Sequence, residues 1–342
     1  MSSPLISIVI ANWNGMKFLD ACLGSIYSRD LSSVEVILVD NGSTDGSVDF
    51  VRERFSRTVV LENTENLGFA AGNNMGISLA KGKYVLVLNN DTKLSNGFLE
   101  KLALAAETSE SNVGMWAPKI LSLESPDVID SVGGLVLYPD GIARGRGRLE
   151  KDLGQFDGLT EIFFPSACAA LYKKEMLDDI GLFDEEFFAY CEDTDLGLRA
   201  RLAGWKALSV PDAVLYHYYS GTGGRYTPLK AYLVERNRLW VALKNFPSSY
   251  LLLTPFYTLW RYIVQIYGIV AGKGTGGKFT EESSALKLVP IVLKAYFDCM
   301  KKVPAMVTKR RTVQKNRAVP AGEVGVWFRK YGLSAAELTL KD

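Results

Sequence analysis

The chain has 342 residues, and its 39 lysines and arginines are balanced by 38 aspartates and glutamates, so its net charge points to no class of charged partner. Its length suffices for one large domain and a second unit, and its apolar fraction of 48% is that of a globular protein. Four cysteines without a CxxC pair argue against a disulfide framework or a zinc knuckle and favour a reducing compartment. The single histidine, His217, excludes a multi-histidine metal site.

Strands that alternate with helices are predicted for residues 5–91. The apolar segments 5–11, 34–40, 58–62 and 83–91 are rich in β-branched residues, as strands buried on both faces are. The segments between them carry apolar residues at helical spacing or a glycine-rich helix entry. This alternation predicts a right-handed, mostly parallel α/β sheet. The first apolar segment lacks the length and the basic leader of a signal peptide, so we expect none.

Each predicted strand is followed by polar residues. The carboxyl ends of parallel strands meet at one edge of such a sheet, and ligands bind beyond that edge. Any one of these polar ends fits an ordinary turn equally well, but four in succession favour a binding site. The residues are Asn12 and Asn14, Asp40 and Asn41, Asn66, and Asn89 to Asp91.

Two acidic features are candidates for chemistry. Asp91 follows a buried strand, where a carboxylate fits a divalent cation that is held by few protein ligands and completed by substrate phosphates; an Asx turn is the alternative. Glu192, Asp193 and Asp195 are close enough to repel one another, and a raised pKa among them would make a general base. Acids that merely favour a helix N-terminus are the alternative there. His217, taken alone, is more often a structural residue than a ligand.

Taken in order, these features resemble the inverting glycosyltransferase family 2, of GT-A fold. The resemblance covers residues 5–245. It is carried by the stretches SIVIANWNG, VILVDNGSTDGS, ENLGFAAGNNMGI, YVLVLNNDT, GLFDEEFFAYCEDTDLGLRARLAGW and VPDAVLYH. Within the family the chain looks most like the bacterial rhamnosyltransferase and galactofuranosyltransferase branch, which builds O-antigen and other surface polysaccharides.

The resemblance implies a role for each matching residue. Asp193 matches the catalytic base, and Glu192 beside it would keep it basic or bind the acceptor. Asp91 and His217 match the protein ligands of a Mn²⁺ or Mg²⁺ ion. Asn89, however, stands where the family has the first acid of its DXD motif, which leaves one firm carboxylate ligand. The residues implied at the donor nucleotide are Asn12, Asp40, Asn41, Ser43, Asn66, Gly68, Asn73, Asn89 and Asn90.

The reaction that the resemblance implies is the transfer of a sugar from a nucleotide diphosphate with inversion at the sugar carbon. L-rhamnose from its thymidine diphosphate donor is the first expectation, by resemblance alone. The expected acceptor is a membrane-borne glycan linked to a polyprenyl diphosphate. Arg199 would either support neighbouring acids or face the phosphates, and the sequence does not separate these two roles.

Residues 250–271 form an apolar run long enough to span a bilayer, but Pro255, Arg261 and Gln265 interrupt it. We therefore expect a helix or a helical hairpin that lies in the membrane interface; a true span and a buried helix are the alternatives. The expected division is a GT-A domain over 1–245, a membrane-associating helical region over 246–318 and a tail over 319–342. The protein would then act at the cytoplasmic face of the inner or plasma membrane, as a peripheral or monotopic protein.

A basic amphipathic helix is predicted next. Residues 287–317 hold nine basic residues against one acid, Asp298. Lys287, Lys294 and Lys301 recur every seven residues and so share a helix face. The apolar residues Leu286, Val289, Leu293, Phe297 and Met300 line another face. Such a helix fits an anionic membrane surface, although a solvated face on a soluble helix remains the alternative. No nucleic-acid-binding fold is apparent, so we expect no nucleic-acid partner.

Two other functions remain to be weighed. A sugar-phosphate nucleotidyltransferase uses a similar sheet but needs a glycine-rich loop after its first strand, which NWNGMK does not provide. A non-catalytic, membrane-bound protein that binds nucleotide sugars or serves as a scaffold would not need Asp91, Asp193 and His217, and all three are present. A dehydrogenase is disfavoured because no GxGxxG follows the first strand.

Overall fold

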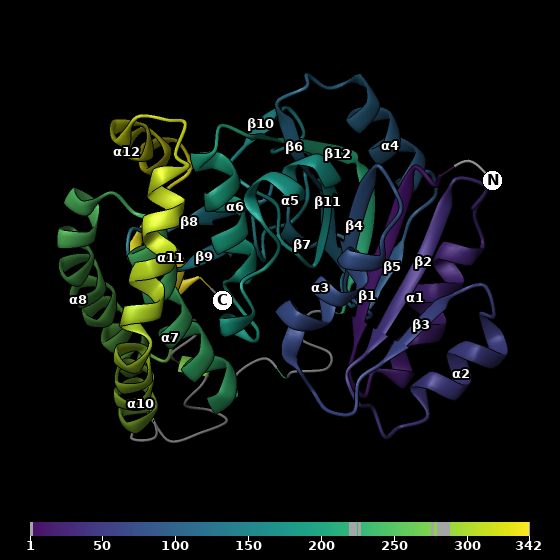
Figure 1. Cartoon of the computed structure of the whole chain (residues 1–342). Helices are drawn as coiled ribbons and strands as arrows, with labels where there is room; N and C mark the ends of the chain where they lie inside the picture. The colour runs from purple at the N-terminus through teal and green to yellow at the C-terminus, as the bar shows by residue number, and fades with distance from the viewer. Residues whose placement is uncertain (1–2, 219–223, 225–226, 275–276, 279–287, 342) are drawn as a thin grey trace. The chain divides into compact units, whose positions relative to one another are not determined.

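The computed structural model of the chain describes residues 3–218, 224, 227–274, 277–278 and 288–341 (Figure 1). The chain forms two compact units. Unit 1 comprises Met1–Leu135, Gly145–Arg201 and Trp205–Thr222, and unit 2 comprises Val136–Arg144, Leu202–Gly204 and Gly223–Asp342. Every residue that the sequence places in the catalytic and nucleotide-binding site therefore belongs to unit 1.

Unit 1 is built on one sheet, with the strand order β10-β12-β6-β11-β4-β1-β2-β3 (Figure 1). The four predicted strands run parallel to one another and are β1 (Ile6–Asn12), β2 (Val34–Asp40), β3 (Val59–Glu62) and β4 (Tyr84–Leu88). The other long strands are β6 (Val113–Ser122), β11 (Ala169–Lys173) and β12 (Lys206–His217); β11 runs antiparallel to both β4 and β6, and β12 runs parallel to β6. The short strands are β5 (Thr92–Leu94), β7 (Ile129–Ser131) and β10 (Glu161–Ile162). The prediction of a mostly parallel α/β sheet is thus confirmed.

Apolar side chains of β1 anchor a helix on each face of the sheet. Successive residues of a strand point to opposite faces, and Ile8 belongs to the same buried cluster as Leu23 of α1. Val9 points the other way, toward α3, and lies so close to Gly76 that a Cβ there would come within 2.4 Å of it. The helices of this unit are α1 (Met16–Tyr27), α2 (Ser47–Arg54), α3 (Gly68–Leu79), α4 (Phe98–Thr108), α5 (Lys174–Ile180), the 3-10 turn η1 (Glu185–Phe187) and α6 (Glu192–Leu202).

Unit 2 is helical, apart from residues of a small hairpin formed by β8 (Leu135–Leu137) and β9 (Ala143–Gly145). Its helices are α7 (Pro228–Asn245), α8 (Ser248–Val270), α10 (Leu288–Lys301), α11 (Val303–Lys315), α12 (Ala321–Lys330) and α13 (Ala335–Leu340). Helices α10 and α11 pack on α7, and α13 packs on α8. Among the described residues, no helix has the length and apolar character needed to cross a membrane. The functional boundaries at residues 245 and 318 stay predictions.

A buried network of four charges holds unit 2 together. Arg261 of α8 donates from Nε to Asp140 Oδ2 at 2.6 Å and pairs through NH1 with Glu235 Oε1 at 2.9 Å. Arg238 of α7 donates from Nε to Glu235 Oε2 at 2.7 Å. Burial by itself would raise the pKa of Glu235, but Arg238 and Arg261 lower it to about 2. Arg261, which interrupts the apolar run in the sequence, is therefore turned inward and neutralised inside the unit.

Replacing Arg261 with methionine is expected to lower the free energy of unfolding by about 3–5 kcal/mol, because Asp140 and Glu235 would keep buried charge without one partner. The urea unfolding midpoint, followed by fluorescence, measures the change. Arg52→Met is the matched control, since its pair with Glu62 is exposed and is worth about 1 kcal/mol or less. Equal shifts of the urea midpoint in the two variants would show that the buried charge network does not stabilise unit 2.

Candidate active site

A chain of hydrogen bonds joins the ends of three neighbouring strands. Asn90 Nδ2 donates to Asn12 Oδ1 at 2.7 Å, and Asn12 Nδ2 donates to Asp40 Oδ1 at 2.9 Å. Ser43 donates to the same carboxylate, from Oγ to Oδ1 at 2.6 Å and from its backbone N–H to Oδ2 at 2.8 Å. The side chains of Asn12, Asp40 and Asn90 are all buried. Because β4, β1 and β2 are parallel neighbours, residues 78 positions apart in sequence meet at one edge of the sheet, as predicted.

The remaining residues predicted at the nucleotide lie beside this edge, with one difference. Asn41 Nδ2 donates to the carbonyl of Gly68 at 3.0 Å, and the backbone N–H of Gly68 donates to Asn66 Oδ1 at 2.9 Å. Gly68 has a φ of +88°, and a Cβ there would collide with Phe188, so only glycine fits. Asn73 is buried within α3 and donates to the carbonyl of Phe69 at 2.8 Å. This bond of Asn73 is local to its helix, unlike those that join Asn12, Asp40 and Asn90, and its role at the nucleotide stays a prediction.

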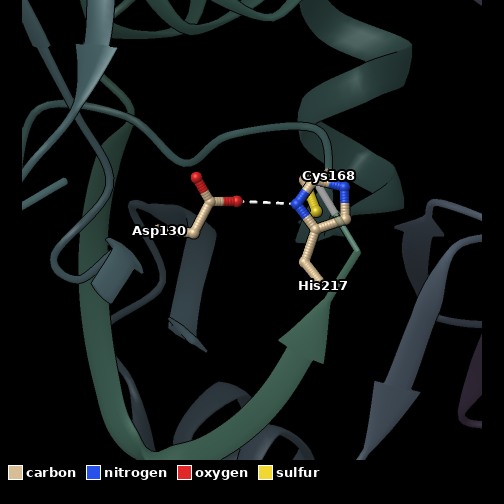
Figure 2. Close-up of side chains that lie close together, drawn as sticks. All are labelled: Asp130, Cys168 and His217. Atoms are coloured by element: carbon tan, nitrogen blue, oxygen red, sulfur yellow. Dashed lines mark hydrogen bonds and ion pairs between the residues drawn. The ribbon is translucent and has the colours of Figure 1, made fainter. Parts of the chain in front are cut away.

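Asp91 and His217 meet although 126 residues separate them in the chain. His217 ends β12, whose pairing with β5 sets it opposite Thr92, the residue after Asp91. His217 Nε2 lies 3.2 Å from Asp91 Oδ1, and both residues are 6% exposed. On the other side of the ring, His217 Nδ1 lies 2.6 Å from Asp130 Oδ2 (Figure 2). The imidazole is thus held between two carboxylates, with the thiol of Cys168 next to it (Figure 2).

This arrangement fits a divalent cation. Nitrogen and oxygen ligands bind such ions at about 2.0–2.2 Å, so an Asp91 oxygen and a His217 nitrogen 3.2 Å apart can reach the same ion. The electrostatics agree: burial alone would lower the pKa of His217, but the hydrogen-bonded carboxylates Asp130 and Asp91 raise it well above its ordinary value. The pocket around the ring therefore favours a positive charge. Asn89, in the place of a second acid, is half-buried, and its backbone N–H donates to the carbonyl of Cys168 at 2.8 Å.

Asp130 and Cys168 are site residues that the sequence did not reveal. Asp130 lies on β7, a strand of three residues with too short a run for any periodic pattern. The one feature of the sequence that could have indicated Asp130 is an acid between the apolar residues Ile129 and Val132, both of which are buried. Cys168 lies just before β11, and burial raises the pKa of its thiol to about 11. It is therefore a neutral thiol rather than a reactive thiolate.

The acidic pair Glu192 and Asp193 opens α6, and the two residues have different surroundings. Asp193 keeps part of its surface open to solvent. It accepts hydrogen bonds from Thr194 N at 2.7 Å, Thr194 Oγ1 at 3.2 Å and Ala167 N at 3.2 Å. Glu192 is 6% exposed, and within the described part of the chain its Oε2 has no hydrogen-bond partner. Burial, and then the charge of Asp193, raise the pKa of Glu192 well above its ordinary value.

The surroundings of the two carboxylates affect their pKa values differently. Burial also raises the pKa of Asp193, but hydrogen bonds from Ala167 and Thr194 act in the opposite direction and favour its charged form. These directions favour a proton on Glu192 before one on Asp193, so Asp193 is the carboxylate better suited to accept a proton. The two roles expected for Glu192, keeping Asp193 basic and binding the acceptor, stay predictions.

Backbone bonds link the carboxylate pair to the metal-ligand pair. Ala167 N–H donates to Asp193, and the next residue, Cys168, lies against His217 and accepts from the backbone of Asn89. Consecutive Cα atoms are about 3.8 Å apart, so the two clusters flank a single short segment. The candidate base Asp193 and the candidate cation site thus both lie against residues 167 and 168.

Arg199 is a structural residue. Its Nε donates to Asp195 Oδ2 at 2.9 Å, and its terminal nitrogens donate to the carbonyls of Ile180, Gly181 and Leu182 at 2.6–3.1 Å. These carbonyls lie at and just after the C-terminus of α5, where orphan carbonyls need donors. The guanidinium therefore ties α6 to this turn, which settles the choice that the sequence left open.

The loop before α6 is strained. Phe188, Tyr190 and Cys191 all have positive φ values, between 65° and 68°, which non-glycine residues rarely adopt. The carbonyl of Phe188 accepts from the backbone N–H of Ala70 at 3.1 Å and so fastens the loop to α3. Such strain persists only where the surroundings impose it. The start of α6, with Glu192 and Asp193, is thus fixed against the N-terminal end of α3.

Comparisons with known proteins show to which family the chain is related. The profile described as "Glycosyl transferase family 2" matches residues 7–181. An N-acetylglucosaminyl-diphospho-decaprenol L-rhamnosyltransferase of Mycobacterium tuberculosis is 25% identical over 65% of this chain and 79% of its own length. The glycosyltransferase GlyG of Streptococcus pneumoniae is 34% identical over 32% of this chain and 38% of its own length. An uncharacterized protein, y4gI of Sinorhizobium fredii, is 25% identical over 65% of this chain but only 25% of its own length.

Solved structures share the fold. A mannosyltransferase from Pyrobaculum calidifontis, solved with GDP-mannose and Mn²⁺, superposes with a TM-score of 0.52 at 16% identity, over 92% of this chain and 86% of its own. The 1–349 fragment of TarS from S. aureus superposes with a TM-score of 0.54 at 18% identity, over 95% of this chain and 91% of its own. At these identities the likeness concerns the fold alone.

Proposed function

Because the chain belongs to glycosyl transferase family 2, we propose that it transfers a sugar from a nucleotide diphosphate to an acceptor hydroxyl with inversion at the sugar carbon. One observation carries the proposal: Asp193 and the Asp91–His217 pair both lie against the single segment of residues 167 and 168. A sugar bound beside this segment would be near both a base and the residues that would hold the metal-bound diphosphate.

Each part of the site has a task in this reaction. The fixed edge of Asn12, Asp40, Asn41 and Ser43 binds the base and ribose, with Asn90 and Asn66 beside it. Asp91 and His217 would hold a Mn²⁺ or Mg²⁺ ion, which neutralises the charge of the departing diphosphate when bound. Asp193 takes the proton from the acceptor hydroxyl as that oxygen attacks the sugar carbon from the face opposite the leaving group. One base and no covalent intermediate give inversion.

We further propose L-rhamnose from dTDP-rhamnose as the sugar and donor, and a glycan linked to a polyprenyl diphosphate as the acceptor. The name of the Mycobacterium tuberculosis relative, which describes a lipid-linked acceptor and a rhamnosyl transfer, supports this choice. The product would enter surface polysaccharide synthesis.

A transfer assay tests the proposal. Radiolabelled dTDP-rhamnose, UDP-galactofuranose and UDP-N-acetylglucosamine are each incubated with the full chain, Mn²⁺ and membranes that carry polyprenyl-linked glycans, and label is counted in the organic extract. Metal-dependent labelling from dTDP-rhamnose is expected. Labelling from another donor would show that dTDP-rhamnose is the wrong donor. If no donor gives labelling although the chain still binds nucleotide, the non-catalytic scaffold is favoured.

The outer face of α8 supports association with a membrane. The helix is apolar outside and polar inside: its buried residues are Thr254, Thr258, Arg261 and Gly268. Its exposed apolar residues recur at helical spacing and are Leu252, Leu253, Phe256, Leu259, Trp260, Ile263, Ile266, Tyr267 and Val270. Moving these exposed apolar side chains from water into an apolar medium would lower their free energy. We propose that this face lies in the interface of the membrane, on its cytoplasmic side.

Helix α10 supports the same proposal over the residues that the structure describes. Val289, Leu293, Phe297 and Met300 are all exposed. Lys294 and Lys301 share a face, since both pair with Asp298, at 3.3 Å and 3.0 Å. Leu286 and Lys287 lie outside the described residues. Basic side chains beside exposed apolar ones favour an anionic membrane surface.

Replacing Phe256 and Trp260 together with serine is expected to weaken binding to vesicles by about tenfold or more, because each aromatic side chain gains about 1.5–3 kcal/mol when it leaves water completely. Co-sedimentation with vesicles that contain anionic phosphatidylglycerol measures the affinity. Leu104→Ser is the control, since Leu104 is a comparably exposed apolar residue of α4. Unchanged binding of the double variant would show that this face of α8 does not bind the membrane.

A further inference from the structure

We propose that Asp130 is a positioning residue, which fixes the ring orientation and the tautomer of His217 so that Nε2 is presented as a ligand beside Asp91. This inference rests on the proposed function, because it takes Asp91 and His217 as the cation's ligands. Asp130 itself would touch neither the ion nor the substrate.

The geometry gives the two ring nitrogens different tasks. Nδ1 lies 2.6 Å from Asp130 Oδ2, and Nε2 lies 3.2 Å from Asp91 Oδ1 (Figure 2 shows the Asp130 side). A neutral imidazole has one N–H and one lone pair. If the N–H is on Nδ1 and donates to Asp130, the lone pair is on Nε2 and faces Asp91. A carboxylate that receives the second N–H of a ligating histidine fixes its tautomer and strengthens it as a ligand.

The fold holds Asp130 in this position. Strand β7 pairs with β6, with Ser131 opposite Ile120 and Ile129 opposite Leu121, so the register shifts by one residue between these pairs and Asp130 is the extra residue. Ile129 and Ser131 on either side of it are both buried, and an irregularity of this kind re-aims a side chain. Its second oxygen, Oδ1, lies 3.7 Å from NH1 of Arg148, which offsets the negative charge.

The need for such support is greater here than in a site with two acids. Asn89 stands at the position of the first acid in the family's DXD motif. With one carboxylate fewer, the imidazole would contribute a larger share of the binding free energy of the ion. A ligand whose ring is already oriented also loses less conformational entropy on binding. Asp130 therefore compensates in part for the missing acid.

The test compares Mn²⁺ affinity among Asp130→Asn, Asp127→Asn and the unchanged chain, by the electron paramagnetic resonance signal of free Mn²⁺ in the presence of dTDP. Asp130→Asn is expected to bind Mn²⁺ about 10- to 100-fold more weakly. Asp127 is an exposed acid three residues away that pairs with Lys151 at 3.6 Å, and its variant is expected to bind normally. Equal affinity in Asp130→Asn and the unchanged chain would overturn the positioning role.

Two further results separate this inference from the proposed function. If Asp91→Asn binds Mn²⁺ weakly and Asp130→Asn binds it normally, the ligand assignment stands and the positioning role alone fails. If the unchanged chain binds no Mn²⁺, both fail together. Because His217 is the chain's single histidine, its ¹⁵N resonances need no assignment. At a pH where the ring is neutral, the proton is expected on Nδ1 in the unchanged chain and increasingly on Nε2 in Asp130→Asn; an unaltered tautomer would overturn the inference.

Discussion

Replacing Asp193 with asparagine is expected to lower the rate constant of sugar transfer by about 10²- to 10⁴-fold, the usual contribution of a positioned general base. Asparagine keeps the shape of the side chain, and its one oxygen can still accept from Thr194, but its amide nitrogen cannot accept from Ala167. The amide also cannot take the proton of the acceptor hydroxyl. Binding of the donor nucleotide is expected to stay near normal, because Asp193 is not part of the edge formed by Asn12 and Asp40. Single-turnover transfer and nucleotide titration measure the two effects separately.

The control for this variant is Asp178→Asn, an exposed acid of α5 that is expected to keep full activity. The pH profile gives a second check. A protonated Asp193 cannot act as a base, so activity falls as the pH drops through its pKa, which lies above the ordinary value of 3.8 because of burial. The acid limb of kcat/KM is therefore expected at a higher pH than that value. Near-normal turnover in Asp193→Asn would disprove the assignment of the base.

Asp91→Asn and His217→Ala are each expected to weaken Mn²⁺-dependent binding of the donor by about 100-fold or more. Loss of an outer partner of a metal ligand already costs about 10- to 100-fold, and these two residues would supply the ligand atoms themselves. Transfer is expected to fall further, since the ion also stabilises the leaving diphosphate. Titration of Mn²⁺ at a fixed donor concentration measures both effects.

Asp49→Asn serves as the control here, because Asp49 is an exposed acid of α2. An unchanged Mn²⁺ titration in His217→Ala would return His217 to a structural role. The same result in Asp91→Asn would show that the carboxylate does not bind the ion at all.

The strand-end residues illustrate what the sequence could predict. Asn12, Asp40 and Asn90 follow three buried strands, and parallel neighbours must bring their carboxyl ends to one edge. The structure joins the three side chains by hydrogen bonds. The prediction succeeded because local apolar pattern identifies the buried strands, and their alternation with helices makes them parallel. Parallel neighbouring strands then place their carboxyl ends at the same edge of the sheet.

Asp130 and Arg261 illustrate what the sequence could not predict. Asp130 reaches His217 through the pairing of a three-residue strand with β6, and no local pattern specifies that pairing. Arg261 finds Asp140 at a separation of 121 residues, on a hairpin that belongs to the same unit as α8. In both cases the partner is fixed by tertiary packing.

The central claim is that the edge of the sheet binds a nucleotide diphosphate together with a divalent cation. Thermal unfolding of the chain with UDP, dTDP, GDP or CDP, each with and without Mn²⁺, tests it most directly, because a ligand that binds the native state raises the midpoint by mass action. We expect dTDP to raise the midpoint and Mn²⁺ to enlarge the shift. No shift with any nucleotide, with or without the metal, would contradict it.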